Sequence, residues 1–211
     1  MKPDYEKLFE MRDPLATLPW RLGIRDMRFQ TPAFHGWILV LFRGSSDALP
    51  PLGLFAATGG RPADVMWSRY PPIFVVSDRV IDLLAGNGLT GWSTYAVEVR
   101  DKKGELVPGY RGFAVTGRAG DHDLHRVFVV QKPVWKGSDR LREVLRGIYL
   151  EDDSWDSSDF SLMGETSNII VTEQVVRAFK KAKIRNVQFT RLPEVEIPAS
   201  VYESFGLWPL K

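Results

Sequence analysis

Two stretches of the chain decide its fold: IFVVSDRVIDLLAGNGLTGWSTYAVEV at residues 73–99 and NIIVTEQVVRAFKKAKIRNVQFTRLPE at residues 168–194. They align without a gap at an offset of 95 residues, which places Ser77 on Thr172. Each begins with a β-branched run typical of a strand and continues with an apolar stripe at helical spacing. A short turn then leads into a second apolar strand. The sequence therefore predicts one strand–helix–strand module that is used twice.

The start of each predicted helix carries capping signals. Ser77 and Thr172 are the expected N-caps, each with a hydroxyl that accepts a hydrogen bond from a free amide of the first turn. Asp78 and Glu173 follow them, and a negative charge there complements the positive end of the helix dipole. The two stretches could also be similar by chance, since the unit is common, and not through a duplication. Both are predicted to form strand–helix–strand modules in either case.

Helices outside the modules are predicted from shorter patterns. A helix is expected to begin at Ser138, because apolar residues then follow the i, i+3, i+4 and i+7 spacing. Those apolar residues are Leu141, Val144, Leu145 and Ile148. A short helix is expected at residues 5–11, and a helical turn at residues 63–68 after the Pro- and Gly-rich loop 48–62.

Strands outside the modules are predicted from apolar runs and turn signals. The run GWILVLF at residues 36–42 is flanked by Gly and polar residues, which favours a buried strand over a helix. The turn DKKG predicts a hairpin between the runs on either side of it. The expected strands are residues 36–42, 95–100, 105–107, 111–116 and 125–131.

These patterns together predict an α+β fold, with a mixed, largely antiparallel sheet and the two strand–helix–strand modules packed against it. We expect a single domain over residues 1–211, since domains commonly run to roughly 100–200 residues. Its expected parts are an irregular N-terminal part (1–70), the first module (72–120), the second module (155–195) and an aromatic tail (196–211).

Composition narrows the class of protein. The chain has no cysteine, which excludes disulfides, thiolate metal sites and a cysteine nucleophile, and suits a reducing compartment. A net charge of +2 gives no general attraction to nucleic acid or anionic lipid. The longest apolar run is residues 37–42, far below the roughly 20 that cross a membrane, and the N-terminal residues lack a secretory signal. We therefore expect a cytoplasmic protein that binds neither nucleic acid nor membrane.

Two motifs suggest chemistry that their context does not support. GNGLTG, residues 86–91, satisfies G-x-G-x-x-G, but its glycines close a helix instead of opening one, so we expect a turn and no dinucleotide. His122 and His125 lie beside Asp121 and Asp123, which are all possible metal ligands. Positions three apart on a strand face opposite sides, so a polar turn without metal is the favoured interpretation.

The acidic segment EDDSWDSSDF, residues 151–160, is the favoured candidate for a binding site. It lacks the spacing of a calcium loop, and a solvated loop is the simplest interpretation. As a functional surface it would present Trp155 as an apolar anchor within an acidic face, which suits a basic protein partner. The carboxylates of this predicted face are Asp152, Asp153, Asp156 and Asp159. No catalytic residues are predicted, because no serine-nucleophile motif is present.

Residues 72–120 and 155–189 resemble the immunity proteins of bacterial polymorphic toxin systems, in the broad Imm-eleven-like group. The similar segments are VSDRVIDLL, a hairpin with GY, the tryptophan–aspartate segment WDSSDF and the closing module IIVTEQVVRAFKKAKIRNVQF. Ser157 stands where the family pattern W-D-G-S-D-F has glycine, so the turn there is expected to differ. The resemblance implies a cytoplasmic protein that neutralises a cognate toxin by binding it, without catalytic residues or a cofactor.

The sequence therefore predicts a non-catalytic immunity protein whose partner is a toxin protein. One alternative is a small metal-dependent hydrolase that uses His122, His125 and nearby carboxylates. Another is a structural subunit whose aromatic tail, with Tyr202 and Trp208, is buried in an oligomer. The oligomeric state and the identity of the toxin stay open.

Overall fold

The computed structural model describes residues 3–24, 32–45, 51–151, 154–164, 166–204 and 207–208, with the backbone alone for 32–35 and 37. It contains 21% helix and 39% strand in several mostly antiparallel sheets, so the predicted α+β class is confirmed. The strands form separate small sheets instead of the one sheet expected.

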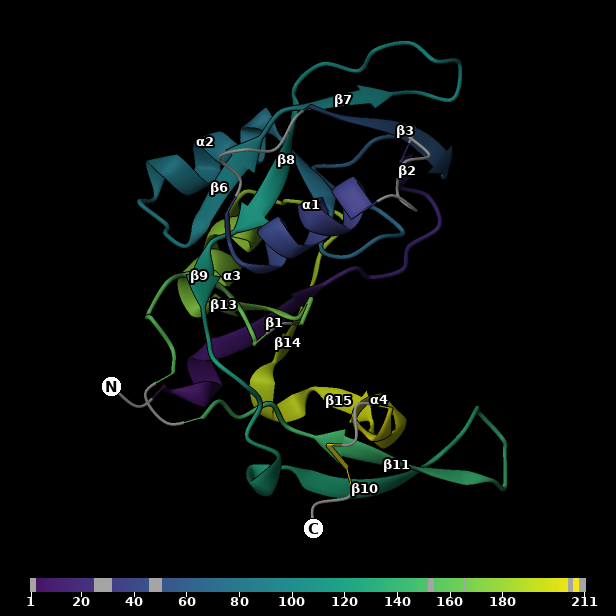
Figure 1. Ribbon diagram of the computed structural model, residues 1–211, viewed down its shortest axis with the longest axis vertical. Coiled ribbons are helices and arrows are strands. Elements are labelled where there is room, and N and C mark those ends of the chain that lie inside the picture. The colour runs from purple at the N-terminus through teal and green to yellow at the C-terminus, as the bar shows by residue number, and fades with distance from the viewer. Residues whose placement is uncertain are drawn as a thin grey trace.

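Two of the sheets contain the predicted modules (Figure 1). The first has the order β4 (Val65–Trp67), β5 (Phe74–Ser77), β8 (Tyr110–Val115) and β6 (Trp92–Tyr95). The second has the order β12 (Phe160–Leu162), β13 (Ile169–Thr172), β1 (Leu8–Arg12) and β14 (Gln188–Arg191), with β9 (Gly117–Arg118) beyond β12. Helices α2 (Asp78–Gly86) and α3 (Glu173–Lys181) connect the module strands.

The remaining strands form two three-stranded sheets. One has the order β2 (Arg21–Ile24), β3 (Leu52–Thr58) and β7 (Val97–Arg100), and the other β10 (Phe128–Pro133), β11 (Leu141–Arg146) and β15 (Glu196–Pro198). The other α-helices of the described residues are α1 (Pro32–Phe42) and α4 (Ala199–Glu203). The short 3-10 helices are η1 (Tyr5–Lys7), η3 (Leu124–Arg126) and η4 (Leu192–Glu194).

The two modules repeat in strand register as well as in sequence. Val65 pairs with Val76 in the first sheet, and Phe160 pairs with Val171 in the second, at the same offset of 95 residues. In each module an antiparallel strand separates the two module strands: β8 in the first and β1 in the second. The repeat thus extends back to β4 and β12, beyond the stretches that the sequence comparison aligned.

One apolar core lies between the two modules and both of their helices. Phe74, Phe113, Phe160 and Phe179 are each at most 2% exposed and follow one another at ring-centroid distances of 5.2, 5.3 and 6.5 Å. Burying one such side chain contributes about 1.5–3 kcal/mol. The modules therefore stabilise each other across this shared core.

The predicted N-caps are in place, but their hydroxyls act differently from the prediction. Ser77 and Thr172 precede α2 and α3, and neither side chain accepts a hydrogen bond from its helix. The Ser77 hydroxyl donates to Asp64 at 3.4 Å, and the Thr172 hydroxyl donates to Asp159 at 2.6 Å. Each of the two hydroxyls lies within reach of a carboxylate, and a hydroxyl donates a strong hydrogen bond to such a charged acceptor.

Three predicted elements were wrong in kind, and in two of them strand pairing overrode the local helical pattern. Residues 36–42 lie in α1, which buries Leu41 against the sheet of β2 and β3, since a short apolar run fits either structure. Residues 5–11 form η1 and then β1, which pairs with strands on both sides. The helix expected from Ser138 is β11, where Val144 and Leu145 are both buried between β10 and β15.

Several other predicted elements differ from the structure in type or in extent. The loop expected at residues 48–62 contains β3, and the helical turn expected at 63–68 is β4. The strand expected at 125–131 begins later, at Phe128, after η3. The DKKG hairpin is confirmed, because the Val107 amide donates to the Val99 carbonyl at 2.8 Å. Within the described residues no helix has the length and apolar character needed to cross a membrane.

Candidate functional site

The predicted acidic face contributes contacts within the fold. Trp155 is half-buried beside a core cluster that includes Leu8, and its indole N–H donates to the Ser161 hydroxyl at 3.2 Å. It therefore does not stand out as an exposed apolar anchor. Asp152 and Asp153 lie outside the described residues.

The other two carboxylates of this face accept hydrogen bonds from the surrounding chain. Asp156 accepts from the backbone amides of Arg118 at 2.7 Å and Ser158 at 2.8 Å. Asp159 accepts from Thr172 and also from the amide and hydroxyl of Thr90. Both carboxylates hold loops in place. That this segment also contacts a partner stays a prediction.

The two histidines do not converge on a common site. His122 lies 2.6 Å through Nδ1 from the Tyr202 hydroxyl and 3.1 Å through Nε2 from the Gly147 carbonyl. Because that carbonyl only accepts, Nε2 carries the proton and the Tyr202 hydroxyl donates to Nδ1. His125 is exposed on η3. Among the described residues no three His, Asp or Glu side chains gather to hold a metal ion.

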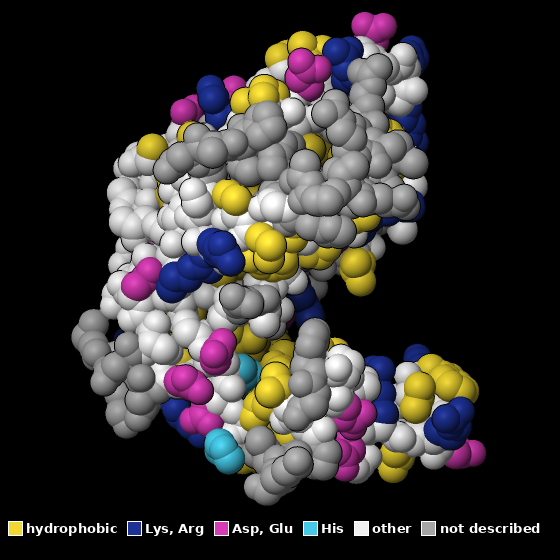
Figure 2. Space-filling model, in the orientation of Figure 1, with side chains coloured by type: hydrophobic (Ala, Val, Ile, Leu, Met, Phe, Trp, Pro, Cys, Tyr) yellow, Lys and Arg dark blue, Asp and Glu magenta, His cyan; other side chains and the backbone are white. Residues whose placement is uncertain are grey.

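A cleft that the sequence did not reveal opens between the modules and the sheet of β11 and β15. Figure 2 shows the molecule hollowed at this level, and the cleft volume is about 690 Å³. Its walls come from segments far apart in the chain. The described residues that line the cleft are Glu10, Phe42, Asp121, Thr166, Ser167, Asn168, Ile197, Val201, Tyr202 and Leu207. A cleft of this size and largely apolar lining is typical of ligand sites.

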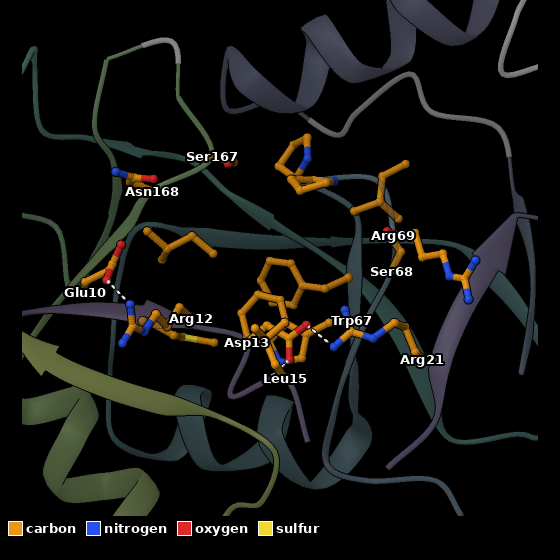
Figure 3. A pocket seen from close by; sticks show the side chains of 16 residues that line it. Glu10, Arg12, Asp13, Leu15, Arg21, Trp67, Ser68, Arg69, Ser167 and Asn168 are labelled. Atoms are coloured by element: carbon orange, nitrogen blue, oxygen red, sulfur yellow. Dashed lines mark hydrogen bonds and ion pairs between the residues drawn. The ribbon is translucent and has the colours of Figure 1, made fainter. Parts of the chain in front are cut away.

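A second, smaller pocket of about 330 Å³ shares Glu10, Ser167 and Asn168 with this cleft (Figure 3). Its lining includes Trp67 and the three arginines Arg12, Arg21 and Arg69. Arg21 pairs with Asp13 at 2.6 Å. Glu10 therefore lines both pockets. Arginines line the smaller pocket, whereas the charged residues among the described lining of the cleft are acidic.

Glu10 is the unusual residue of this region. It is 8% exposed on the central strand β1, and its Oε2 accepts no hydrogen bond. Its nearest ion-pair partner is Arg12, with 3.7 Å between Oε2 and Nη1. Burial raises the pKa of Glu10 above its ordinary value, and the attraction of Arg12 offsets part of that increase. A buried carboxylate with an unused acceptor is costly, which makes Glu10 a candidate for a functional residue.

Tyr202 lines the same cleft and interacts electrostatically with Glu10. Burial raises the pKa of Tyr202 to about 12, with a further contribution from the negative charge of Glu10. Desolvation lowers the pKa of His122, which keeps its ring neutral and able to accept the hydrogen bond from Tyr202. The tyrosine ring is thus fixed in position at the edge of the cleft.

A second candidate surface is the β10–β11 hairpin with its connecting residues 134–140, here called the hairpin arm, which extends away from the body in Figure 1. Four of its large apolar side chains are exposed: Phe128 (64%), Val129 (49%), Trp135 (59%) and Leu141 (59%). β10 lies at the edge of its sheet and pairs with β11 alone among the described strands. Residues 128–146 also carry five basic and two acidic side chains.

No protein-family model matches the chain, and a search of the curated proteins finds none with significant similarity. The resemblance to toxin immunity proteins therefore rests on the sequence segments quoted above.

Proposed function

We propose that the chain is a non-catalytic immunity protein that binds and neutralises a bacterial toxin. The single observation that carries the binding role is the hairpin arm, which exposes Phe128 and Trp135 on a projecting element. Aromatic side chains of this kind are enriched at the centres of protein interfaces. The segments that resemble immunity proteins supply the class of partner.

The arm offers two means of attachment. The free edge of β10 carries backbone N–H and C=O groups that can pair with a strand of the partner. The exposed apolar side chains would fill pockets on that partner, and the excess of basic residues favours an acidic rim around those pockets. This assignment places the main contact on the arm, whereas the sequence placed it on the segment around Trp155.

The test is protection of cells that express a toxin encoded beside the gene for this chain, together with the affinity of the purified pair. The double variant Phe128→Ser, Trp135→Ser should weaken binding by about 30-fold or more if both are central contacts. Leu106→Ser is the matched control, because Leu106 is also exposed (56%) but lies on the DKKG hairpin.

Loss of protection in the double variant with protection retained in the control would support the proposal. Protection by neither the parent chain nor any variant, with no toxin-like neighbouring gene, would contradict it. If Trp155→Ala with Asp156→Ala abolishes binding in a folded protein while the arm variant does not, the toxin-binding role stands and the arm assignment fails.

The geometry gives less support to the alternative of a metal-dependent hydrolase. His122 uses both ring nitrogens within the fold, and His125 lies apart from it on η3. Elemental analysis of the purified protein tests this alternative, and stoichiometric zinc or manganese would favour it.

A further inference from the structure

We propose that the cleft beside Glu10 is a binding site for an organic cation, that is, an ammonium or guanidinium group on an apolar stem. This site is independent of the toxin-binding role proposed for the hairpin arm. It uses different residues and can be tested without any toxin.

The first argument is the unused acceptor of Glu10. Its Oε2 is shielded from solvent and faces Nη1 of Arg12 at 3.7 Å without accepting a hydrogen bond. Figure 3 shows the other carboxylate oxygen directed away from Arg12, toward the side of Asn168, which lines both pockets. No hydrogen bond from the described residues reaches that oxygen either, and a buried carboxylate without donors is destabilising. A bound ammonium or guanidinium group would bring the donors that the protein does not provide.

The second argument is the charge of the cleft. Among the described residues, those that line it and carry a charge are Glu10 and Asp121, and both are acidic. The arginines of this region line the smaller pocket instead. Charge complementarity therefore favours a cation in the larger cleft and disfavours an anion of the same size.

The third argument is the apolar wall opposite Glu10. Ile197 and Val201 line it together with the ring of Tyr202, whose hydroxyl is already used in donating to His122. An aromatic ring attracts a cation over its face, and the hydrogen bond to His122 holds this ring in one orientation. The aliphatic side chains would cover the stem of the ligand. A carboxylate, a fixed aromatic ring and an apolar wall together form a suitable cradle for an organic cation.

Two sources could supply such a group: a free amine, or a lysine or arginine side chain of a bound peptide. Isothermal titration calorimetry with two sets of probes distinguishes them. The first set is 2-phenylethylammonium, with phenylacetate as an anion of similar size. The second set is N-acetyl-lysine methylamide and N-acetyl-arginine methylamide, with N-acetyl-leucine methylamide as the neutral control.

The expected result is saturable binding of at least one cation, with the anion and the neutral control at least tenfold weaker. Glu10→Gln should weaken the cation at least tenfold, because it keeps the shape of the side chain and removes its charge. Glu203→Gln is the matched control, since Glu203 lies on the same helix as Tyr202 but outside the cleft lining, and its affinity should stay within twofold of the parent.

Binding of 2-phenylethylammonium alone supports the proposal with a free amine as the source. Binding of a blocked amino acid supports it with a peptide side chain as the source. The proposal is overturned if no cation binds, if phenylacetate binds as tightly, or if Glu10→Gln binds cations as well as the parent chain does. Thermal unfolding of Glu10→Gln without ligand confirms that the variant is folded. Neither result bears on the hairpin arm, whose own variants test the toxin-binding role.

Discussion

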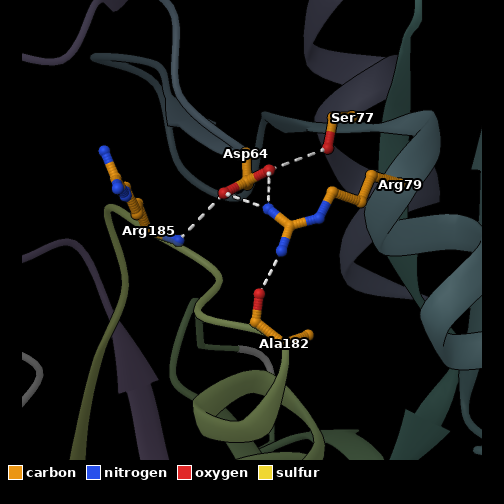
Figure 4. A network of polar contacts seen from close by, with 5 residues as sticks. All are labelled: Asp64, Ser77, Arg79, Ala182 and Arg185. Atoms are coloured by element: carbon orange, nitrogen blue, oxygen red, sulfur yellow. Dashed lines mark hydrogen bonds and ion pairs between the residues drawn. The ribbon is translucent and has the colours of Figure 1, made fainter.

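Asp64 and Asp159 are equivalent residues of the two modules, and each links its own module to the other. Each carboxylate accepts a hydrogen bond from the hydroxyl that precedes its own helix and another from a backbone amide of the opposite module. Figure 4 shows the network around Asp64. The equivalent donors are Ser77 Oγ and Arg185 N for Asp64, and Thr172 Oγ1 and Thr90 N for Asp159. Asp64 also accepts from Nη1 of Arg79 at 3.2 Å, and Asp159 also accepts from the Thr90 hydroxyl. Thr90 and Arg185 are themselves 95 residues apart, so the linkage is reciprocal.

Removal of either carboxylate should destabilise the whole fold. Asp159→Ala should lower the free energy of unfolding by about 2–3 kcal/mol, because at least two donors lose their acceptor. Asp64→Ala should cost less, since Ser77 and Arg185 lie at 3.4 and 3.1 Å compared with 2.6 and 3.0 Å for the equivalent donors to Asp159. The further donor, Arg79, has an exposed side chain, and an exposed ion pair contributes only about 0–1 kcal/mol. Urea denaturation measures both. Asp82→Ala, at an exposed position of α2, is the control and should change stability little.

The glycines of GNGLTG should differ in their tolerance of a side chain. Gly88 and Gly91 both have positive φ, at +63° and +82°. A Cβ at Gly88 would meet no atom within 4 Å, whereas one at Gly91 would collide with the carbonyl oxygen of Phe160. Gly88→Ala should therefore cost about 1–2 kcal/mol from the backbone alone. Gly91→Ala should cost clearly more, and equal unfolding midpoints for the two variants would contradict the close packing of β12 on this turn.

Replacement of Ser157 by glycine should stabilise the fold. Its φ of +67° lies in the left-handed region, which a residue with a Cβ adopts only at a cost. The backbone there has a glycine-like conformation, at the position where the family pattern has glycine. Ser157→Gly should raise the free energy of unfolding by about 0.5–1 kcal/mol, because the left-handed conformation no longer strains a side chain. Lower stability would mean that the serine makes a compensating contact.

Glu10 should make the protein less stable as the pH rises. The pKa of Glu10 is raised above 4.5 in the folded state by burial, so the folded protein binds the proton more tightly than the unfolded chain does. Stability is therefore highest below pH 4.5 for this group and falls as the pH rises through the folded-state value. Among the described residues, the charged groups near Glu10 are Arg12 on its own strand and Asp121 in the cleft, and the neutral phenol of Tyr202 also lines the cleft. Glu10→Gln should remove this part of the pH profile and leave the protein as stable or more stable at pH 7.

His122 should make the protein less stable as the pH falls, which is opposite to the effect of Glu10. Desolvation lowers the pKa of His122 below 6.5 in the folded state, so the unfolded chain binds the proton more tightly. Stability from this group is present above pH 6.5 and is lost as the pH falls through the folded-state value. His122→Gln should flatten the profile there. Tyr202→Phe should cost about 1–2 kcal/mol at pH 7, because Nδ1 of His122 then has no donor.

The modules could be predicted from sequence because their signals are local and repeated. Strand, helix and turn follow one another within about 25 residues, and Ser77 and Thr172 mark both helix starts. The helix at residues 32–42 could not be distinguished from a strand, since a short apolar run such as the one ending at Leu41 fits both. At Val144 and Leu145, burial on both faces of a central strand imitated the spacing of an amphipathic helix.

The cleft could not be predicted, because its residues share no local pattern. Glu10 follows Phe9 in a strand that was predicted as a helix, and its burial depends on β13 and β14, which lie far along the chain. Tyr202 was assigned to an aromatic tail that packs on the body of the protein, with no contact to His122 or Glu10 predicted for it. The local sequence contained no signal, because an acidic residue between two apolar neighbours, Phe9 and Met11, is the ordinary alternation of a strand with one solvated face.

The position of β1 between β13 and β14 has a consequence for synthesis of the chain. On the ribosome, β1 emerges long before its two neighbours, whereas β8 follows β5 and β6 soon after they are made. The first module can therefore assemble while translation continues, and the second must wait with its central strand unpaired. A nascent chain arrested before β13 would carry β1 as an exposed segment, open to chaperones and proteases until β13 and β14 are made.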